Sequence, residues 1–344
     1  MSILKWVGGS SDNFGDKGNW APHQVPNSHS DVIIEPSSAT TIVAATTEIN
    51  SLATNADTTL AVGATGIFTI VGAPDAANPT GASTNGGTFS LGQCAELFID
   101  GQFTNAGLLG TGDRSDMIVD GAFTNAGVAD QNGDVTLGNP SHAGTLTNER
   151  GATWSINGDA NIDGAVGSHL TNAGTLTRSG TGVTDIVDVS TTNSGSVSVT
   201  SGELDFVSDI GTLLSNTGTM TATDATLILD EAVSGVGKLD LGAGGALTLV
   251  GGPDAGQTVD FLGNNATLDL LPAGDFGGHI SGFGAHDLID LANTIVNHQS
   301  FFGGVLTLSD GLIPVAHLNF NGAYSTSSFS LSADRNGGTL IHFV

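Results

Sequence analysis

The chain is poor in basic residues, with 7 Lys and Arg against 34 Asp and Glu among its 344 residues. The formal net charge of −27 repels phosphate backbones and anionic membrane surfaces, which argues against nucleic acid or an acidic lipid surface as a partner. The simplest interpretation is that the carboxylates solvate the outside of a β-rich protein and keep its edges from pairing. They could also recruit Ca²⁺, and the sequence indicates no other cofactor.

Cysteine and aromatic residues are scarce. Cys94 is the single cysteine, so no intrachain disulfide can form. The segment 91–99 around it is predicted to be a strand, and we expect Cys94 to be a small core residue rather than a nucleophile. Aromatic residues make up 6% of the chain, so Val, Ile, Leu and Ala must supply most of the core.

Long apolar runs are also lacking. No segment approaches the roughly 18 consecutive apolar residues of a membrane helix. The N-terminus shows no basic stretch followed by an apolar run, so we expect either a cytoplasmic protein or one exported without a cleaved N-terminal signal. Helical periodicity is scarce as well, and the best short helix candidates are residues 48–53 and 288–296.

What the chain does contain is short β-branched runs between clusters of Gly, Asn, Asp and Ser, which are typical of strands joined by tight turns. Through the middle of the chain one phrase recurs: in most copies an apolar residue and Thr or Ser precede Asn-x-Gly. The successive Asn residues are 20, 23, 24, 21 and 23 positions apart. They are Asn105, Asn125, Asn148, Asn172, Asn193 and Asn216.

This period predicts an all-β, single-chain parallel β-helix, in which the same position of each coil lies about 4.8 Å above the last. We expect each Asn to adopt a left-handed backbone conformation and to hydrogen-bond along the stack, with the Gly two residues later as a second permissive position. Similar strand-like segments before and after the repeat bring the total to about a dozen coils. The apolar residues before the turns should form an internal stack, namely Phe103, Phe123, Leu146, Leu170 and Leu214.

The two ends of the chain differ from the middle. A solenoid exposes an open β edge at each end and needs caps. We predict an N-terminal aromatic cap with the first strands at 1–45, solenoid coils at 46–270, and a Phe-rich C-terminal β element at 271–344. The predicted contacts between copies, end to end, are Trp6, Trp20, Phe301, Phe302 and Phe343.

Both ends also carry a resemblance. Residues 6–34, with Trp6, Gly18-Asn19-Trp20, Val25-Pro26-Asn27 and Asp31-Val-Ile-Ile, look like the start of autotransporter-like and adhesin-like bacterial solenoids. The phrase Ile-Ser-Gly-Phe-Gly-Ala-His-Asp-Leu-Ile-Asp-Leu at 280–291 is similar to the closing segment of proteins exported by type I secretion. The apolar end at 336–344 resembles their uncleaved C-terminal signal.

The resemblance implies a secreted bacterial surface protein, located outside the cell or on its surface. Asp287 and Asp290 match the phrase that follows the calcium-binding repeats of such exported proteins, which makes them candidate Ca²⁺ ligands. The tandem Gly-Gly-x-Gly-x-Asp array of those proteins is missing from this sequence, and that puts calcium sites of the same type in doubt.

Parallel β-helices often act on polysaccharides, and hydrolysis needs two carboxylates about 5–9 Å apart. Glu203 and Asp205 share one face of a predicted strand, whereas Asp287 with Asp290 fits less well. The scattered cations argue against a lyase for anionic polymers. Trp154 could be a sugar platform, although we expect a core or lateral-face residue. The nine His residues show no recognised metal-ligand spacing.

The sequence therefore favours a noncatalytic structural or adhesive protein of the bacterial cell surface or extracellular matrix, one that assembles with itself into filaments. A cell-surface or matrix polysaccharide is the second expected partner. A polysaccharide-active enzyme and a glycan-binding module without chemistry remain the alternatives.

Overall fold

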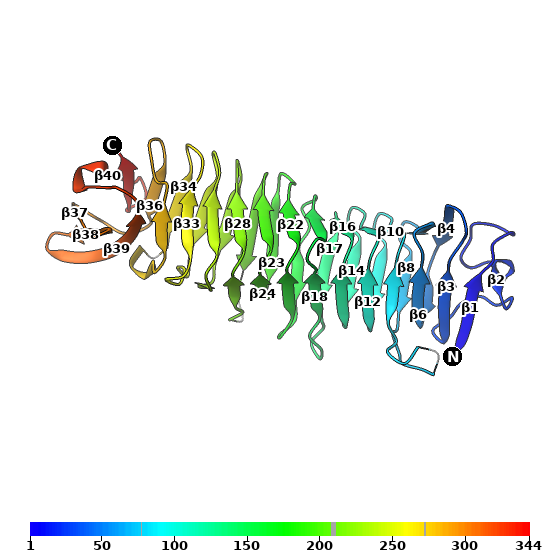
Figure 1. Ribbon diagram of the computed structural model, residues 1–344. Coiled ribbons are helices and arrows are strands. Elements are labelled where there is room, and N and C mark those ends of the chain that lie inside the picture. The colour runs from blue at the N-terminus through cyan, green and yellow to red at the C-terminus, as the bar shows by residue number, and fades with distance from the viewer. Residues whose placement is uncertain (77, 208–210, 272) are drawn as a thin grey trace. The chain divides into compact units, whose positions relative to one another are not determined.

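The computed structural model describes residues 1–76, 78–207, 211–271 and 273–344 (Figure 1). The fold is all-β, with 51% strand and 2% helix, and forms a parallel β-solenoid of about 12 turns, which confirms the predicted fold class. The chain divides into two compact units. Unit 1 is Met1–Leu176 with Val187–Ser190, and unit 2 is Thr177–Ile186 with Thr191–Val344. The predicted division into cap, coils and terminal element stays a prediction.

In unit 1 each coil contributes one strand in turn to three sheets, named A, B and C here. Sheet A contains β2 (Trp20–Ala21), β1 (Ser2–Trp6), β3 (Ser30–Ile34), β6 (Ser51–Thr54), β9 (Ser83–Asn85), β12 (Gln102–Asn105), β15 (Ala122–Asn125), β18 (Thr145–Asn148) and β21 (His169–Asn172). Sheet B contains β4 (Thr40–Ala44), β7 (Thr58–Val62), β10 (Thr88–Leu91), β13 (Leu108–Gly110), β16 (Val128–Gln131) and β19 (Thr153–Ile156). Sheet C contains β5 (Thr47–Ile49), β8 (Ile67–Ile70), β11 (Glu96–Ile99), β14 (Asp116–Val119), β17 (Asp134–Leu137) and β20 (Ile162–Gly164).

Unit 2 has strands in the same three positions. The strands at the boundary between the units are β22 (Thr175–Arg178), β23 (Val183–Val187) and β24 (Ser190–Asn193). Sheet A continues the list with β27 (Leu214–Asn216) and β30 (Val233–Ser234). Sheet B contains β25 (Ser196–Val199), β28 (Thr219–Ala222), β31 (Lys238–Leu241), β33 (Thr258–Phe261), β35 (His279–Ser281), β39 (Ile313–Asn321), β38 (Val305–Asp310) and β37 (His298–Phe302). Sheet C contains β26 (Glu203–Val207), β29 (Thr226–Leu229), β32 (Ala246–Leu249), β34 (Thr267–Leu270), β36 (Leu288–Leu291), β41 (Thr339–Phe343) and β40 (Phe329–Ala333).

The described residues form no α-helix, only the short 3₁₀ turns η1 (Lys17–Asn19), η2 (Ala273–Asp275) and η3 (Thr326–Ser328). The two helix candidates are therefore wrong. Residues 48–53 span parts of β5 and β6, and 288–296 begin as β36 and continue as a turn. Their apolar residues belong to the strand periodicity of the coils, which a window this short does not separate from a helical one.

The repeated Asn residues end strands of sheet A and are stacked in register. Asn105 lies opposite Asn125, and its Nδ2 donates to Asn125 Oδ1 at 2.9 Å and to the Val128 carbonyl at 2.8 Å. Both amide hydrogens are thus used between neighbouring coils. The same side-chain bond joins Asn85 to Asn105, Asn125 to Asn148 and Asn148 to Asn172 in unit 1, and Asn193 to Asn216 in unit 2.

All six predicted ladder residues are buried, and the ladder is longer than the repeat suggests. Asn85 accepts a hydrogen bond from Thr54 Oγ1 at 2.9 Å, so unit 1 begins the row with a hydroxyl. In unit 2, Asn216 Nδ2 donates to Gln257 Oε1 at 3.1 Å, which continues the row with a longer amide. A buried amide that bonds both up and down the stack loses little hydrogen bonding on burial.

The expected left-handed backbone at the repeated Asn is wrong, because the residues with positive φ in the described chain do not include these Asn. Of the six described Gly that follow them, Gly151 alone is left-handed, with a φ of 88°, in the copy that carries one extra residue. The Gly of the Asn-x-Gly turn is needed because the backbones of neighbouring coils come too close at this position to leave room for a side chain. A Cβ on Gly107 would clash with the carbonyl oxygen of Gly87, and one on Gly127 would clash with that of Gly107. The left-handed residues lie at a different turn, between sheets B and C, at Thr65, Cys94 and Arg114 in unit 1. Each of these sits two residues after a Gly.

The core of unit 1 is a row of aromatic and aliphatic side chains. Phe103 stacks on Phe123 with ring centroids 5.5 Å apart, and Trp154 meets Phe123 edge-on at 5.7 Å. At the N-terminal end the ring of Trp20 packs on Phe14, 4.9 Å away. The five residues predicted to form an internal stack are all buried, three of them as aliphatic side chains, namely Leu146, Leu170 and Leu214.

The C-terminal end of unit 2 changes from parallel to antiparallel pairing. β39 pairs in parallel with β35 and is followed outward by β38 and β37 in antiparallel order, while β36 is followed by β41 and β40. Phe320 and Phe329 pack under these strands with centroids 5.0 Å apart, and Phe329 stacks on Phe283 at 6.3 Å. An aromatic cluster therefore covers the last coil, as the rise in Phe content predicts.

We expect the ladder to contribute measurably to stability. Replacing Asn125 with Ala leaves the Asn148 Oδ1 and Thr153 carbonyl without their donor, which should lower the free energy of unfolding by about 1–3 kcal/mol. Thr124→Ala, on the outward face of the same strand, is the control and should change it by less than about 0.5 kcal/mol. Urea unfolding followed by circular dichroism measures both; equal losses would contradict a special role for the amide.

Candidate functional site

The outer faces of the sheets carry carboxylates directly opposite one another. In unit 1, Asp116 lies between Glu96 and Asp134 in neighbouring strands of sheet C. In unit 2, Asp240 lies opposite Asp260, and Asp269 lies opposite Asp290. Neighbouring strands are about 4.8 Å apart, so these like charges repel across the ladder. Sequence reasoning missed the rows, although the Leu-Asp-Leu phrases at 239–241 and 268–270 were a usable signal.

This arrangement raises pKa values along the rows. Partial burial raises the pKa of Asp116, and the charges of Asp134 and Glu96 raise it further. Burial is also the main cause of the raised pKa of Asp290, followed by the charges of Asp269 and Asp334. The outer face of the solenoid therefore holds carboxyl groups that take up protons more readily than free ones.

Asp205 is the most perturbed of these groups. Burial, followed by the charges of Asp230, Asp185 and Glu203, raises its pKa to about 7. Its Oδ1 is buried and has no hydrogen-bond partner. A carboxyl group of this kind is partly protonated near neutral pH and can act as a proton donor.

The predicted pair Glu203 and Asp205 does share one face. Leu204 and Phe206 point into the core, so Glu203 and Asp205 project outward from β26, about 6.6 Å apart along the strand. The two side chains therefore start from points of the backbone whose spacing is comparable to the carboxyl separation that glycoside hydrolysis needs.

The structure separates Asp287 from Asp290. Asp287 is buried at the start of β36, and its two carboxylate oxygens accept hydrogen bonds from the backbone N–H groups of Ala266 and Gly284 at 3.2 and 3.0 Å. Asp290 faces the opposite side of the strand, toward Asp269. Asp287 thus stabilises its turn, and across the described ranges no group of three acidic, His or Cys side chains converges as a metal site.

Trp154 is a core residue. It is buried, its Nε1 donates to Gln131 Oε1 at 2.8 Å, and its ring contacts Phe123. The ring is therefore not available as a sugar platform.

Cys94 is not a core strand residue, contrary to expectation. It is exposed and has a φ of 55° in the turn between β10 and β11. Gly92 two residues earlier closes this turn by accepting a hydrogen bond from the Ala95 N–H. The predicted strand over 91–99 includes this turn, so the alternation of inward and outward residues wrongly assigns Cys94 to the core.

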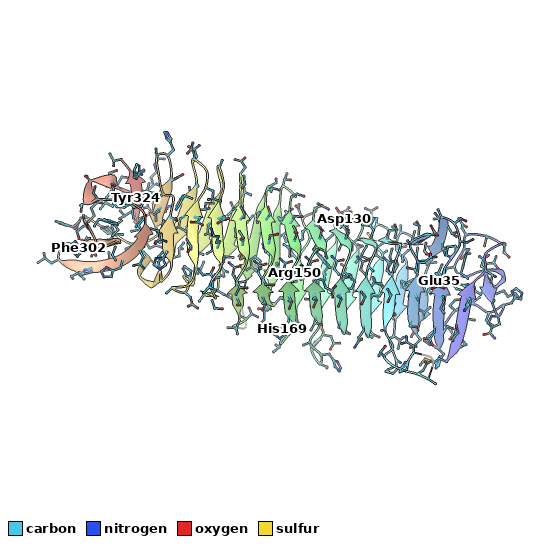
Figure 2. The ribbon with its side chains drawn as sticks, in the orientation of Figure 1. Glu35, Asp130, Arg150, His169, Phe302 and Tyr324 are labelled. Carbon is cyan, nitrogen blue, oxygen red and sulfur yellow. The ribbon has the colours of Figure 1, made fainter. Side chains whose placement is uncertain are left out.

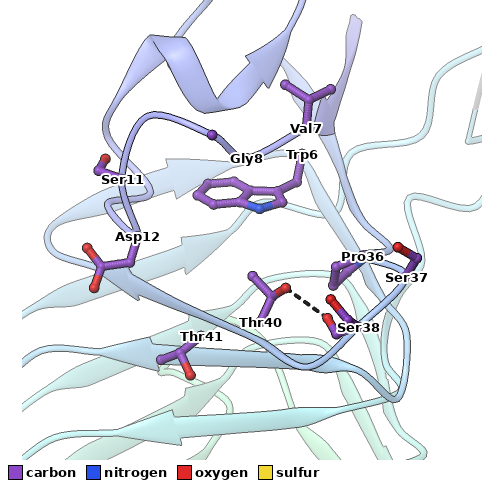
Figure 3. Close-up of a pocket in the computed structure, with 11 residues that line it drawn as sticks. Trp6, Val7, Gly8, Ser11, Asp12, Pro36, Ser37, Ser38, Thr40 and Thr41 are labelled. Atoms are coloured by element: carbon purple, nitrogen blue, oxygen red, sulfur yellow. Dashed lines mark hydrogen bonds between the residues drawn. The ribbon is translucent and has the colours of Figure 1, made fainter.

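The aromatic residues predicted to join copies occupy different environments. Trp20 is fully buried, and its Nε1 donates to the Phe14 carbonyl at 2.8 Å, which removes it from any contact with a second copy. Trp6 is half-buried and lines a groove of about 450 Å³ (Figure 3). Pro36 and Ser38 form the opposite side of this groove, where Thr40 Oγ1 donates to the Ser38 carbonyl at 2.8 Å.

At the other end of the chain, Phe301 and Phe343 are half-buried and pack within the C-terminal aromatic cluster, on Phe329 and Phe283 respectively. Phe302 is 90% exposed at the turn between β37 and β38, where its ring projects away from the sheet (Figure 2). Of the five predicted contact residues, Phe302 is the one whose ring lies almost wholly in solvent.

In comparisons with known proteins, no family model, no curated sequence and no solved structure matched this chain. Among the residues that the structure describes, no helix is long and apolar enough to cross a membrane.

The raised pKa of Asp205 predicts a pH-dependent stability. The folded state binds the proton more tightly than the unfolded chain, so the free energy of unfolding should rise as the pH falls from about 7 toward about 4. Asp205→Asn should be more stable than the wild type at pH 8, by about 1 kcal/mol after allowance for solvent screening, and the difference should vanish near pH 4.

Thermal melts from pH 4 to pH 8 measure this difference. Asp254→Asn, which removes the same charge at an exposed position of unit 2, is the control. Its stability relative to the wild type should not change between pH 8 and pH 4 in the way expected for Asp205→Asn. A wild-type melting temperature that is independent of pH, or a parallel shift in both variants, would contradict the prediction.

Proposed function

We propose that this chain is an exported, noncatalytic structural or adhesive protein of the bacterial cell surface or extracellular matrix, and that its copies assemble end to end into filaments. The observation that supports this is the state of the terminal strands of sheet C. Among the described residues, β5 in unit 1 has one strand neighbour, β8, and β40 in unit 2 has one neighbour, β41. An edge strand with free backbone groups is a template for pairing with another chain.

Other edges are covered in part by neighbouring segments, and β40 is covered at its first residue, where the Phe329 carbonyl accepts a hydrogen bond from Gln299 Nε2. At the N-terminal end, β2 covers the edge of sheet A, and Val43 of β4 exchanges backbone hydrogen bonds with Asp12 and Phe14. At the C-terminal end, the Phe301 N–H of β37 donates to Thr326 Oγ1. A second copy could therefore add to sheet C without displacing a cap.

The exposed Phe302 adds an apolar side chain at the same end of the chain as β40. Large apolar side chains that protrude from an acidic, well-solvated surface favour association. Export by type I secretion is part of this proposal. It rests on the similarity of 280–291 to the closing segment of proteins exported by that route, and of 336–344 to their uncleaved C-terminal signal. Ca²⁺ would promote assembly by screening the repulsion between copies that each carry a net charge of −27.

Electron microscopy of the purified protein at neutral pH, with and without Ca²⁺, tests the assembly. We expect fibres in the wild type, and their loss in Ser332→Lys, because a lysine on an edge strand opposes pairing. Ser327→Lys adds the same charge on η3, away from the strand, and should still form fibres. Dispersed monomers in every condition, or fibres in Ser332→Lys, would count against the proposed contact.

A second candidate function is polysaccharide hydrolysis, and the raised pKa of Asp205 beside Glu203 is the observation that favours it. In this case Asp205 would donate the proton to the leaving group and Glu203 would act as the second carboxylate. A glycan-degradation screen should then show turnover that falls by at least ~100-fold in Asp205→Asn and persists in Asp254→Asn. Activity that is unchanged in Asp205→Asn, or absent from all substrates, would eliminate this candidate.

A further inference from the structure

The groove beside Trp6 lies within unit 1, and its walls come from two segments of the chain (Figure 3). One wall is Trp6 at the end of β1, together with the turn that follows it as far as residue 12. The other is the connection at 36–38 and the start of β4. The volume of about 450 Å³ falls within the roughly 300–1,000 Å³ of sites for small organic ligands.

The turn after β1 is held in place by hydrogen bonds. The side-chain Oδ1 of the buried Asn19 accepts from the N–H groups of Ser10 and Ser11 at 3.1 and 3.2 Å. The same turn is joined to β4, where the Val43 N–H donates to the Asp12 carbonyl at 2.8 Å. A site whose walls are ordered before binding loses less entropy when a ligand enters it.

Trp6 differs from the other two tryptophans in its exposure and its hydrogen bonding. Trp20 and Trp154 are buried, and each donates its indole N–H to a protein oxygen. Within the described ranges Trp6 Nε1 has no hydrogen-bond partner, and it is not one of the buried polar atoms, so this donor is accessible to a ligand. Figure 3 shows the nitrogen edge of the ring turned toward Thr40 and Ser38 across the groove.

The ring of Trp6 is fixed by the ring of Trp20, which lies nearly perpendicular to it with centroids 5.1 Å apart. The exposed part of an indole ring offers an apolar surface with a negative face, on which the C–H groups of a sugar ring can pack. Pro36 and Ser38 on the opposite wall present a second apolar ring and an exposed hydroxyl. A ligand with flat apolar faces and many hydroxyl groups matches both walls.

The charge of the groove selects against acidic sugars. Of the residues that line it, all of them described, Asp12 alone is charged. A uronate or phosphate group would therefore find no cation to pair with, and the net charge of −27 would repel it. Neutral hydroxyl groups carry no such penalty, and they can donate as well as accept.

We propose that this groove binds a short stretch of a neutral, hydroxyl-rich polysaccharide of the cell surface or matrix. A sugar ring packs on the indole of Trp6, a sugar oxygen accepts a hydrogen bond from Trp6 Nε1, and Pro36 and Ser38 contact the other side of the ligand. This inference rests on the proposed surface or matrix role and names the chemical class of its polysaccharide partner. It assigns Trp6 to that partner rather than to a contact between copies, and it does not depend on filament formation.

Fluorescence titration of the full chain tests the site, because Trp6 is the accessible indole. The probes are cellotetraose, maltotetraose and mannotetraose. We expect saturable binding of at least one of them, accompanied by protection of Trp6 from quenching by acrylamide. Binding of tetragalacturonate should be at least ~10-fold weaker at the same ionic strength, because its carboxylates are repelled.

Variants measured by isothermal titration calorimetry locate the site. Trp6→Ala should lose the binding, and Trp6→Phe, which keeps a ring but no N–H, should weaken it by about 5-fold. Ser38→Phe fills the groove from an exposed position and keeps the carbonyl that Thr40 Oγ1 bonds, so it should fold and lose the binding. Thr46→Phe adds the same ring at an exposed turn outside the groove and should bind like the wild type.

No saturable binding of any neutral tetrasaccharide to the folded wild type would overturn the proposal, and so would binding that survives in Ser38→Phe. Equal affinity for tetragalacturonate would contradict a neutral ligand. Saturable binding of decaproline in place of the sugars would assign the groove to a peptide and overturn the proposal as well. Fibres without tetrasaccharide binding would refute this site alone, and tetrasaccharide binding without fibres would refute the assembly alone.

Discussion

The in-register stacking of coils through buried side-chain amides is the constraint on which the rest of the structure depends. Asn105 and Asn125 each donate two hydrogen bonds from Nδ2 to the next coil, one to an amide oxygen and one to a backbone carbonyl. A slip of one residue would turn each amide outward and bring its outward-facing neighbour, such as Thr124, into the core. The amides therefore specify one register, and the close glycine contacts such as Gly107 against Gly87 require the same one.

A fixed register inside the coils also fixes what meets outside them. Once the inward residues are aligned, every outward residue has a partner at the same level, so Asp240 must lie opposite Asp260 and Asp269 opposite Asp290. Burial, followed by the charge of Asp260, raises the pKa of Asp240, and Lys238, which forms a 2.8 Å ion pair with Asp260, lowers it in part. The raised pKa of Asp205 thus has a purely structural explanation as well as a catalytic one, and turnover is what separates them.

The sequence predicts the architecture well because every coil of a solenoid uses the same pattern of inward residues and turns, so the pattern recurs along the chain. The strands at 116–119, 134–137 and 153–156 lie where the alternation places them, and so does the row of buried Asn. Periodicity identifies which residues recur but carries no information on their φ angles. This is why the left-handed conformation was assigned to Asn105, although the turn at Cys94 and Arg114 is where it occurs. Asn85 was missed although Thr84 precedes it and Gly87 follows two positions later, as in the copy at Asn193.

The burial of Asp31 on the outer side of β3 (Ser30–Ile34) was not predictable for the opposite reason. Asp31 Oδ1 accepts hydrogen bonds from Asn50 Nδ2 and Ser51 Oγ, and Asn78 and Ala82 line a cavity with Asp31. Nothing in the local pattern of β3 signals these contacts. A stack of identical coils presents the same face again and again, so it can offer avidity for a polymer but little discrimination between polymers. Discrimination requires a place where the repeat is interrupted. In this chain the connection at 71–82 between β8 and β9 and the antiparallel strands around Phe302 are such places, because both depart from the repeated coil.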